Sequence, residues 1–541
     1  MGVFDKIRDW GRALMQRTAG AAGVAHEFKD IFELGGVPAF NQFYAVGIFV
    51  WKALYRGLYK PWHVVPAPTI ADKNARRELY RLNTAKAVCS EMAGLVWGEE
   101  CEIGISMTGR ESSDDSPDPL SEYVADVLRR NAFHEKMQEL IEQALALGGA
   151  AIKARYEVRH DRDGKEIPGT GAVRLDYCMA DQFVPIAWDN AKVTEGVFIS
   201  RLAKQGYYYT RLEWHRWDGT SYVVTNELYR ADMVRGVNGG NQDILGVRWP
   251  LADVFPFLDE QTVIPVEESL FSYFRTPIAN NLDDNSPLGM SVYGNALETL
   301  HSLDICFDSF NQEFILGKKR IIVPACAVRS VVDPQTGAVR RYFDANDAVY
   351  VALNSDTPND LKITDNTVEL RVDEHVSALN AYLSILCLQV GFSAGTFSFD
   401  TRGGIKTATE VVSENSKTYK TVKTIQNMLR PMIEHTVRNI IDVAILYDEQ
   451  WQGQSVASLA ARGYDVSITF DDGIIQDRQT NINEGVMLVG AGLLSKQRFL
   501  GCKKYGQGLT LEQVREELKR IREENAPTVN TEQLRLFGGG A

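Results

Sequence analysis

The sequence lacks the motifs of the common nucleotide-dependent and hydrolytic enzymes. Its 541 residues contain no GxxxxGK[ST] phosphate loop, no GxSxG nucleophile turn and no HExxH zinc helix. None of the eight histidines has an obvious partner, and His134 and His435 lie on predicted helices, where a packed or exposed side chain is the simpler interpretation. The sequence therefore predicts a protein that is not an enzyme, with no catalytic residue, cofactor or metal.

Cysteine is also scarce, and its spacing excludes two further classes of protein. The seven cysteines are scattered and form no C-x-x-C pair, which argues against a zinc site. Their odd number in a long chain argues against a disulfide framework. We expect reduced, mostly buried thiols in a cytosolic protein.

No long hydrophobic run is present that would span a membrane. The uncharged stretch Leu34–Trp51 is shorter than the ~20 residues that a span needs, and it contains Pro38. A buried helix is the better interpretation of this region. The N-terminus reads as an amphipathic helix rather than a signal peptide, and Lys6 breaks the myristoylation pattern. We expect no membrane partner.

Positive charge is in deficit. The chain has 58 lysines and arginines against 71 acidic residues, a formal net charge of −13. Tight, sequence-independent DNA binders usually carry a basic surface. If this protein meets DNA, we expect it to guide the DNA rather than hold it.

Hydrophobic periodicity predicts an α+β fold that is predominantly helical. Residues 1–110 read as mainly helical, and a long helix is expected over Leu120–Ala146. Residues from about Ala150 to Glu260 form short β-rich runs separated by turn signals, which predicts an antiparallel sheet packed on helices. Hairpin turns are expected at His160–Glu166 and at the WDGTSYV segment.

A helix, a compact insert and a second helix follow. The first helix is expected over about Gly289–Leu316, roughly 42 Å long, with an apolar stripe. The insert, about Arg320–Val372, has β-like runs (RIIVP, AVRRYF, AVYVAL, TVELR) and a DPQTG turn. The second helix is expected over about Asp373–Phe392, where apolar residues recur in a 3-4-3-4 rhythm.

A Gly- and Ser-rich loop, Gly391–Lys406, precedes a long helix predicted over Thr407–Tyr447. Pro431 should kink this helix, and Thr407 or Thr409 can cap its start. A strand (DVSITF), the acidic turn DDGIIQD and a last helix from Thr510 complete the chain.

Two acidic groups leave a metal-dependent alternative open. Asp471, Asp472 and Asp477 could form a nuclease-like cluster, but a solvated turn is the simpler interpretation. Asp304 and Asp308, one helical turn apart, could bind a cation, but surface charge facing solvent or a neighbour is the preferred interpretation.

The segment Gly391–Leu429 resembles the tunnel-loop and long-helix region of siphovirus portal proteins. The resemblance lies in the GTFSFD lead-in and in the TATEV motif of residues 407–411. SPLGMSVYGNALETLHSLD, KKRIIVP, and DDGIIQDR with a later GLLSKQ agree, in the family's order. The resemblance covers about residues 80–525.

The resemblance implies a portal fold with wing, stem, clip and crown. The wing would comprise residues 1–285, with its β-rich part at about 150–260, the stem helices 286–318 and 373–392, and the clip 319–372. Residues 393–465 would be the tunnel loop and a long kinked wing helix, and residues 466–541 the crown and tail.

The same resemblance implies residues for the DNA-facing loop: Thr396, Phe397, Ser398, Phe399, Asp400, Thr401, Arg402, Gly403, Gly404, Ile405 and Lys406. Thr407, Thr409 and Glu410 would form the loop-to-helix motif. Lys318, Lys319 and Arg320 would be basic residues between stem and clip, although a helix-ending charge cluster also explains them.

The implied function is a ring of about twelve subunits at one capsid vertex of the virion, assembled in the host bacterial cytoplasm. It would conduct double-stranded DNA during packaging and ejection. It would dock the terminase large subunit and head-tail adaptors, and contact major capsid and scaffolding proteins. The alternatives are another phage head or baseplate protein and, less favoured, a metal-dependent DNA-processing enzyme.

Overall fold

A computed structural model describes residues 42–68, 72–98, 101–107, 118–161, 163–190, 192–232, 245–283, 286–317, 321–324, 330–332, 339–341, 350–353, 364–365, 369–399, 415–470, 478–501 and 511–524. The chain divides into two compact units: residues 1–402 with 417–471, and residues 403–416 with 472–541. Helices and strands are both abundant, which confirms the mixed α+β class.

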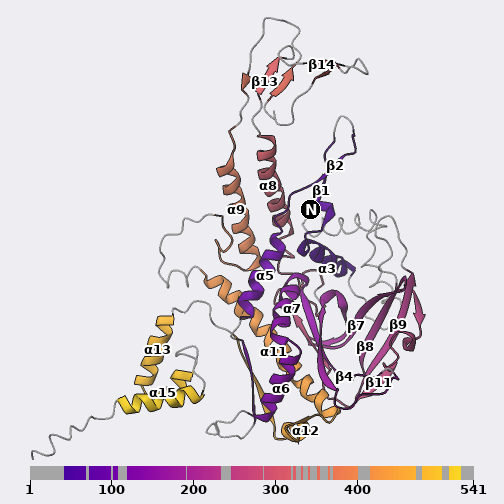
Figure 1. Ribbon diagram of the computed structural model, residues 1–541, viewed down its shortest axis with the longest axis vertical. Helices are drawn as coiled ribbons and strands as arrows, with labels where there is room; N and C mark the ends of the chain where they lie inside the picture. Colours follow the sequence, from indigo (N-terminus) through magenta and orange to yellow (C-terminus); the bar gives the residue numbers. More distant parts are fainter. Residues whose placement is uncertain are drawn as a thin grey trace, which may run out of the picture. The chain divides into compact units, whose positions relative to one another are not determined.

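The larger sheet of the first unit is antiparallel, as predicted (Figure 1). Its strands run in the order β10-β9-β8-β7-β6, and β11 also pairs with β9. Their bounds are β6 Phe183–Asp189, β7 Lys192–Lys204, β8 Tyr207–Asp218, β9 Ser221–Asp232, β10 Val247–Trp249 and β11 Gln261–Ile264. The predicted hairpin between β8 and β9 is confirmed, with Gly219 at φ +60°.

A smaller antiparallel sheet, ordered β12-β4-β5, packs against the larger one. Its strands are β12 Phe271–Arg275, β4 Gly149–Glu157 and β5 Ala172–Met179. Between the two sheets lies a buried cluster of Ala151, Phe183, Val193, Phe198 and Phe271. The turn predicted after β4 is confirmed by an isolated bridge between His160 and Glu166.

The helix predicted over Leu120–Ala146 is wrong as a single element. It is two helices, α6 Pro119–Arg130 and α7 Phe133–Leu147, separated where Ala132 has φ +48°. Asn131 explains the break, because its side chain donates to the Val173 carbonyl (3.1 Å) and accepts from the Leu175 amide (3.1 Å). The end of α6 is therefore tied to strand β5.

Helices from the first hundred residues pack beside α7. Helix α3, Gln42–Tyr55, is the buried helix predicted there, since Ile48, Val50, Trp51 and Leu54 are nearly inaccessible. Helix α5, Thr84–Val96, also packs on α7. No helix among the described residues is long and apolar enough to cross a membrane.

A two-stranded sheet joins distant parts of the sequence. Strand β20, Tyr464–Thr469, is the predicted DVSITF strand, and it pairs antiparallel with β3, Glu102–Met107. The strand β3 was not predicted, because residues 1–110 read as mainly helical.

The helix–insert–helix order is confirmed. Helices α8, Leu297–Leu316, and α9, Val372–Val390, lie side by side, with the strands of the insert at their outer end (Figure 1). These strands are β13 Ile321–Pro324, β14 Ser330–Val332, β15 Val339–Arg341, β16 Tyr350–Leu353 and β17 Thr364–Asp365. A strand was expected at TVELR, residues 367–371. This prediction is wrong for residues 369–371, the part that the structure describes, because they are irregular.

The start expected for the first helix, Gly289, is wrong by eight residues. Residues 289–296 are instead bound to the body: the Thr276 hydroxyl donates to the Met290 carbonyl (2.5 Å) and Val292 N–H to the Leu145 carbonyl (2.9 Å). A Cβ on Gly289 would lie 2.4 Å from the Gly148 carbonyl oxygen. The helix of 20 residues is therefore about 30 Å long.

The long helix α11 spans Ser416–Leu446 among the described residues and contains Pro431. The predicted start at Thr407 lies outside the described residues, and the kink at Pro431 stays a prediction. Short elements follow: β18 Gln450–Trp451, β19 Gln454–Ser455 and α12 Val456–Ala460. The second unit contains α13 Arg478–Gly490, α14 Lys496–Gly501 and α15 Leu511–Glu524, the predicted last helix.

The five described cysteines are free thiols, as expected. Cys89 and Cys387 are buried, whereas Cys101, Cys178 and Cys306 are half-buried. The other two lie outside the described residues.

Candidate functional site at the base of the helix pair

A strap formed by residues 59–68 and 72–82 lies along helix α8 (Figure 1). It comprises α4 Lys60–His63 and the antiparallel strands β1 Val64–Pro66 and β2 Arg76–Glu78. Trp62 at its start stacks on His301 of α8, with ring centroids 4.8 Å apart. The strap thus contacts α8 directly.

Asp304 is the first carboxylate that binds the strap to α8. Its Oδ2 lies 2.9 Å from Nε2 of His63, and its Oδ1 accepts the Leu82 amide at 3.0 Å. Asp304 is only 7% exposed. A buried carboxylate is stabilised by hydrogen bonds of this kind, which replace those it would make to water.

Asp308 is the second carboxylate that binds the strap to α8. Both oxygens accept from the two terminal nitrogens of Arg77 at 2.7 Å, and Oδ1 also accepts the Tyr80 amide at 3.1 Å. The side chain of Asp308 is 6% exposed. The Arg77 hydrogen bonds hold the pKa of Asp308 below its usual value. This is the bidentate geometry for which arginine is suited.

The preferred interpretation of Asp304 and Asp308 as surface charge is therefore wrong. The cation alternative has no support either, because no group of three potential metal ligands occurs among the described residues. Their partners lie 222 to 241 residues earlier in the chain. Helical spacing shows that two acids share a face, but not which segment covers that face.

The start of the Gly-rich loop lies in a second cluster, where α9 meets α11. Gly391 ends α9 at φ +90°, and the Thr421 hydroxyl donates to its carbonyl at 2.8 Å. The Ser393 amide donates to the Thr418 hydroxyl at 2.8 Å. The start of the loop is thus held against α11 by neutral hydrogen bonds. Thr418 and Thr421 were not singled out from the sequence, although they are one turn apart on the predicted helix.

Four of the predicted loop residues lie in the described part of the chain. The Thr396 hydroxyl donates to the Ser393 carbonyl (2.8 Å), and Phe397 packs edge-on against Phe392. The Phe399 amide donates to Asn380 of α9 at 2.9 Å, while its side chain is half exposed. Ser398 lies between them. The loop therefore starts along α9.

The other predicted site residues lie outside the described residues: Asp400, Thr401, Arg402, Gly403, Gly404, Ile405, Lys406, Thr407, Thr409, Glu410, Lys318, Lys319 and Arg320. The acidic turn residues Asp471, Asp472 and Asp477 lie outside them as well.

The two histidines expected on helices are packed. His134 contacts the ring of Trp97, with centroids 5.3 Å apart. His435 on α11 is largely buried, and burial lowers its pKa to about 4, although Glu268 lies 3.2 Å away. Neither is part of a catalytic arrangement.

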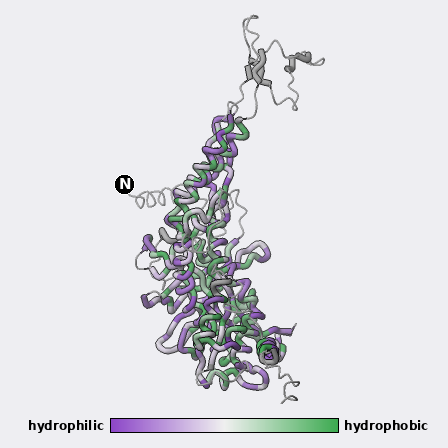
Figure 2. The backbone as a smooth tube through the Cα atoms, turned by 90° about the vertical axis from the view of Figure 1, so that its left-hand side faces the viewer, coloured by the Kyte–Doolittle hydropathy of each residue, from purple (hydrophilic) through white to green (hydrophobic). Residues whose placement is uncertain are grey.

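Away from the strap, the helix pair leaves apolar side chains in solvent. Hydrophobic segments continue toward the outer ends of both helices (Figure 2). The exposed residues are Phe314, Ile315 and Leu316 at the outer end of α8, Ile305 beside Asp304, and Tyr382, Ile385 and Leu388 in the half of α9 nearer the body. Leu388 is 68% exposed. An apolar row of this kind on a single chain is typical of a protein interface.

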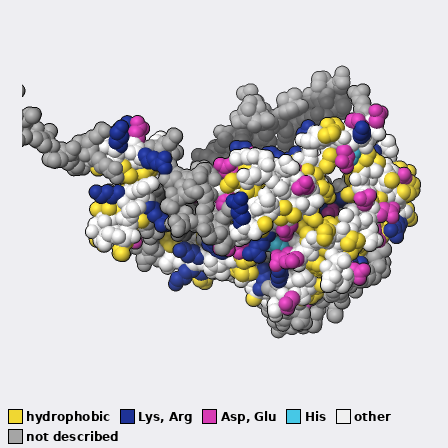
Figure 3. All heavy atoms as spheres, turned by 90° about the horizontal axis from the view of Figure 1, so that it is seen from below, with side chains coloured by type: hydrophobic (Ala, Val, Ile, Leu, Met, Phe, Trp, Pro, Cys, Tyr) yellow, Lys and Arg dark blue, Asp and Glu magenta, His cyan; other side chains and the backbone are white. Residues whose placement is uncertain are grey.

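Charge is not concentrated on the face in Figure 3. Acidic and basic side chains intermingle there with hydrophobic ones. That face is therefore unlike the basic surface of a protein that grips DNA.

The family assignment rests on one extensive match. The model of the family described as phage portal protein, SPP1 Gp6-like, matches residues 48–530. No curated protein sequence matches the chain. The matched region contains both sheets, the helix pair with its strap, the insert and the long helix. The chain therefore belongs to the SPP1 Gp6-like family of phage portal proteins, which are structural proteins rather than enzymes.

Proposed function

We propose that this protein forms a ring of about twelve subunits at one vertex of a phage capsid. The ring is a passage for double-stranded DNA during packaging and ejection. It docks the terminase large subunit and head-tail adaptors, and it contacts the major capsid and scaffolding proteins. It assembles in the host bacterial cytoplasm and remains in the virion.

The observation that carries the proposal is the set of exposed apolar side chains along α8 and α9. A ring requires two different patches that meet head to tail on neighbouring subunits. Side chains such as Phe314 and Leu388 supply one patch that a single chain leaves uncovered. The face of α8 that carries Asp304 and Asp308 needs no neighbour, because the strap already covers it.

In portal terms, we assign residues 1–285 to the wing, α8 and α9 to the stem and residues 319–372 to the clip. Residues 393–465 contain the tunnel loop and a long wing helix, and residues 466–541 are the crown and tail. The basic residues Lys318, Lys319 and Arg320 would meet phosphate between stem and clip. The motor that consumes ATP is a separate protein, since the sequence has no phosphate loop.

Electron microscopy of the purified protein tests the ring. We expect rings with a central hole. A protein that stays monomeric at high concentration in every salt condition would exclude this function.

The loop role has its own test. Deletion of Gly403 and Gly404 should leave ring assembly intact and impair DNA packaging, because the deletion shortens the segment that we assign to the channel. A matched control replaces the exposed Gly206 of the β7–β8 turn by Asn, which tolerates positive φ. Normal packaging by the deletion variant would remove the proposed role of the loop.

A further inference from the structure

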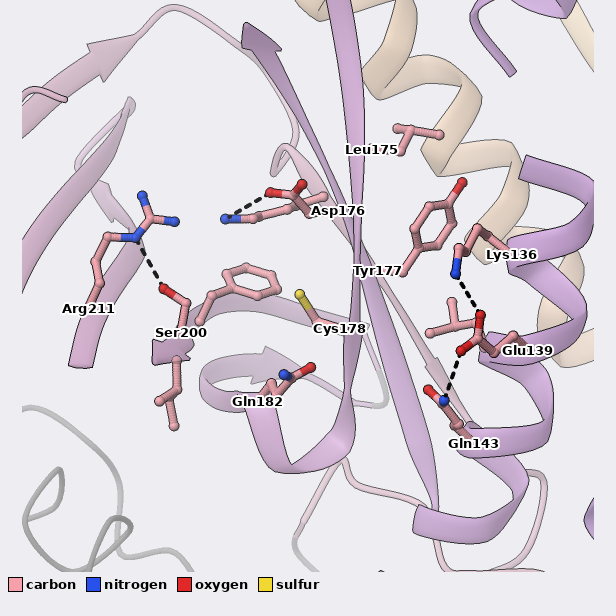
Figure 4. A pocket seen from close by; sticks show the side chains of 14 residues that line it. Lys136, Glu139, Gln143, Leu175, Asp176, Tyr177, Cys178, Gln182, Ser200 and Arg211 are labelled. Carbon is pink, nitrogen blue, oxygen red and sulfur yellow. Dashed lines mark hydrogen bonds and ion pairs between the residues drawn. The ribbon is translucent and has the colours of Figure 1, made fainter. Parts of the chain in front are cut away.

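A cleft of about 460 Å³ lies over one edge of the smaller sheet. Figure 4 shows strand β5 in its centre: Asp176 and Cys178 point toward Arg211 and Ser200, while Leu175 and Tyr177 point toward helix α7. The far wall on the α7 side carries Lys136, Glu139 and Gln143. The cleft is therefore a slot along β5 with one wall from α7 and one from the larger sheet.

The edge of β5 is protected at both ends but not in the middle. Asn131 bonds the Val173 carbonyl and the Leu175 amide, and Gln182 accepts the Met179 amide at 3.1 Å. Along an edge strand, the backbone N–H and C=O of every second residue face outward. The N–H and C=O of Tyr177 therefore face the slot, as do the backbone groups of Leu175 and Met179. Within the described part of the chain, the backbone N–H and C=O of Tyr177 have no partner on that side. An unpaired edge of this kind is a template for an added strand.

The walls of the slot favour an uncharged occupant. Lys136 pairs with Glu139 at 2.7 Å, and Lys153 lies 3.6 Å from Asp176. Arg211 pairs with Glu213 at 2.7 Å. Because each of these charges is neutralised within the chain, a charged side chain entering the slot would lose its hydration without gaining a partner.

One segment of the sequence fits that requirement. Residues Thr18–Ala25, TAGAAGVA, are the only run of eight in the sequence with no charge and no side chain larger than valine. The 16 residues from His26 to Asn41 separate this run from α3. Fully extended, they span at most about 55 Å, which exceeds the diameter of a typical folded domain.

The C-terminal end of helix α3 lies close to the slot. Lys52 of α3 forms an ion pair with Asp181, the neighbour of Gln182, and Tyr55 donates to Glu142, the neighbour of Gln143, at 2.5 Å. The arm joins α3 at Gln42, about 15 Å from Lys52 along the helix, which its 16 residues can span. The described residues of the chain leave the slot open. We propose that residues 18–25 of a second copy add as a strand to the edge of β5, so that each subunit of the ring holds the N-terminal arm of the next. This inference rests on the proposed ring, since it needs an adjacent copy.

Cysteine cross-linking in assembled rings tests the proposal, because Cys178 already lines the slot. Single cysteines are placed at each position from Thr18 to Ala25, and disulfide formation is followed by non-reducing electrophoresis. A disulfide joins only residues that lie directly opposite each other, so the cross-link to Cys178 should form at one position of the run and not at the two positions beside it, whose side chains point to the other face. This cross-link should vanish in the matched Cys178→Ser chain. The substitution Asp9→Cys, outside the segment, should give none.

Mixed rings identify the donor of the arm. One chain carries the arm cysteine with Cys178→Ser, and the other keeps Cys178 with the native arm. Cross-linked dimers in the mixture support exchange between copies. If the mixture gives no cross-linked dimer, while the chain that carries both cysteines gives only single chains of altered mobility, each arm fills its own slot and the proposal is overturned.

A slot-filling variant provides a second readout. Ser200 is exposed on the wall of the slot, so Ser200→Trp should abolish cross-linking, whereas Ser200→Ala should preserve it. Rings without cross-links at any of the eight positions would overturn the arm exchange and leave the proposed function standing. Absence of rings from the unaltered protein would overturn the function itself.

Discussion

The inner and outer parts of helix α8 differ in what covers their side chains. At the base, Asp304 and Asp308 are buried and bonded to the strap of their own chain. Farther out, Phe314, Ile315 and Leu316 are exposed although they are apolar. The strap-facing side of α8 is thus covered by its own chain, whereas no described residue covers the side chains farther out. We expect the first group to serve folding and the second to serve assembly.

The largest effect is expected at the base. Asp308→Ala leaves the Arg77 guanidinium and the Tyr80 amide without their acceptor. Because the Arg77 side chain is 38% exposed and can turn to water, we expect a loss of about 1–3 kcal/mol, less than for a fully buried pair. The free energy of unfolding in urea measures this loss. Asp308→Asn, which keeps an acceptor for Tyr80, should lose less. Equal losses for the two variants would contradict the role of the Tyr80 hydrogen bond.

The pH dependence of stability distinguishes the base from the exposed pairs. The pKa of Asp308 is lowered in the folded state, so its ionised form stabilises the fold above the ordinary carboxyl pKa. The ordinary pKa of an aspartate is about 4. The contribution is lost as the pH falls from that value through the lower pKa of the folded state. The stability of Asp308→Asn should therefore decline less with acid over this range than that of the unaltered protein. Parallel curves would show that Asp308 contributes nothing through ionisation.

A much smaller effect on folding is expected in the exposed apolar row. Replacing Ile385 and Leu388 by Ser should change the unfolding free energy of the single chain by about 1 kcal/mol per site or less, because Leu388 is 68% exposed and Ile385 45% exposed. The same variant should fail to form rings in the electron microscope. The control, Leu386→Ser, removes a fully buried neighbour and should destabilise the chain itself. Rings from the double variant would remove the row from the interface.

The smallest effect is expected for the ion pair at the outer end of α8. Hydrogen bonds from Arg371 lower the pKa of Glu313 to about 2, but the pair is open to solvent and screened by salt. Glu313→Gln should therefore leave the urea midpoint unchanged, both in dilute buffer and in 1 M salt. A clear drop in the midpoint would show that the outer part of the pair is also held by its own chain.

The sequence predicted elements whose periodicity is local. The rhythm of Leu379, Leu383, Leu386 and Val390 placed α9 almost to the residue. The buried helix α3 was predicted from its uncharged run, which is too short to span a membrane. Prediction from local periodicity failed where a segment distant in the sequence binds the end of a helix. Asn131 ends α6 because strand β5 offers its edge more than 40 residues later, and α8 starts late because Met290 and Val292 bond the body.

The candidate site shows the same limit. The loop was predicted from its glycines and from the resemblance of its flanking motif, and its first residues do lie along α9. The anchors Asp304 and Asp308 were seen as a pair, but their burial depends on His63 and Arg77, which no local pattern links to them. Composition reveals the charge of a helix face, and only the tertiary fold reveals what covers it.

A symmetry-resolved image of the assembled particle is the most direct test of the ring. The account predicts about twelve copies of this chain around a channel at one capsid vertex, with the exposed apolar side chains of α8 and α9 packed against neighbouring copies and the Gly391–Lys406 loop beside the channel. A particle in which the chain occupies another position, or in which those apolar side chains face solvent, would contradict it.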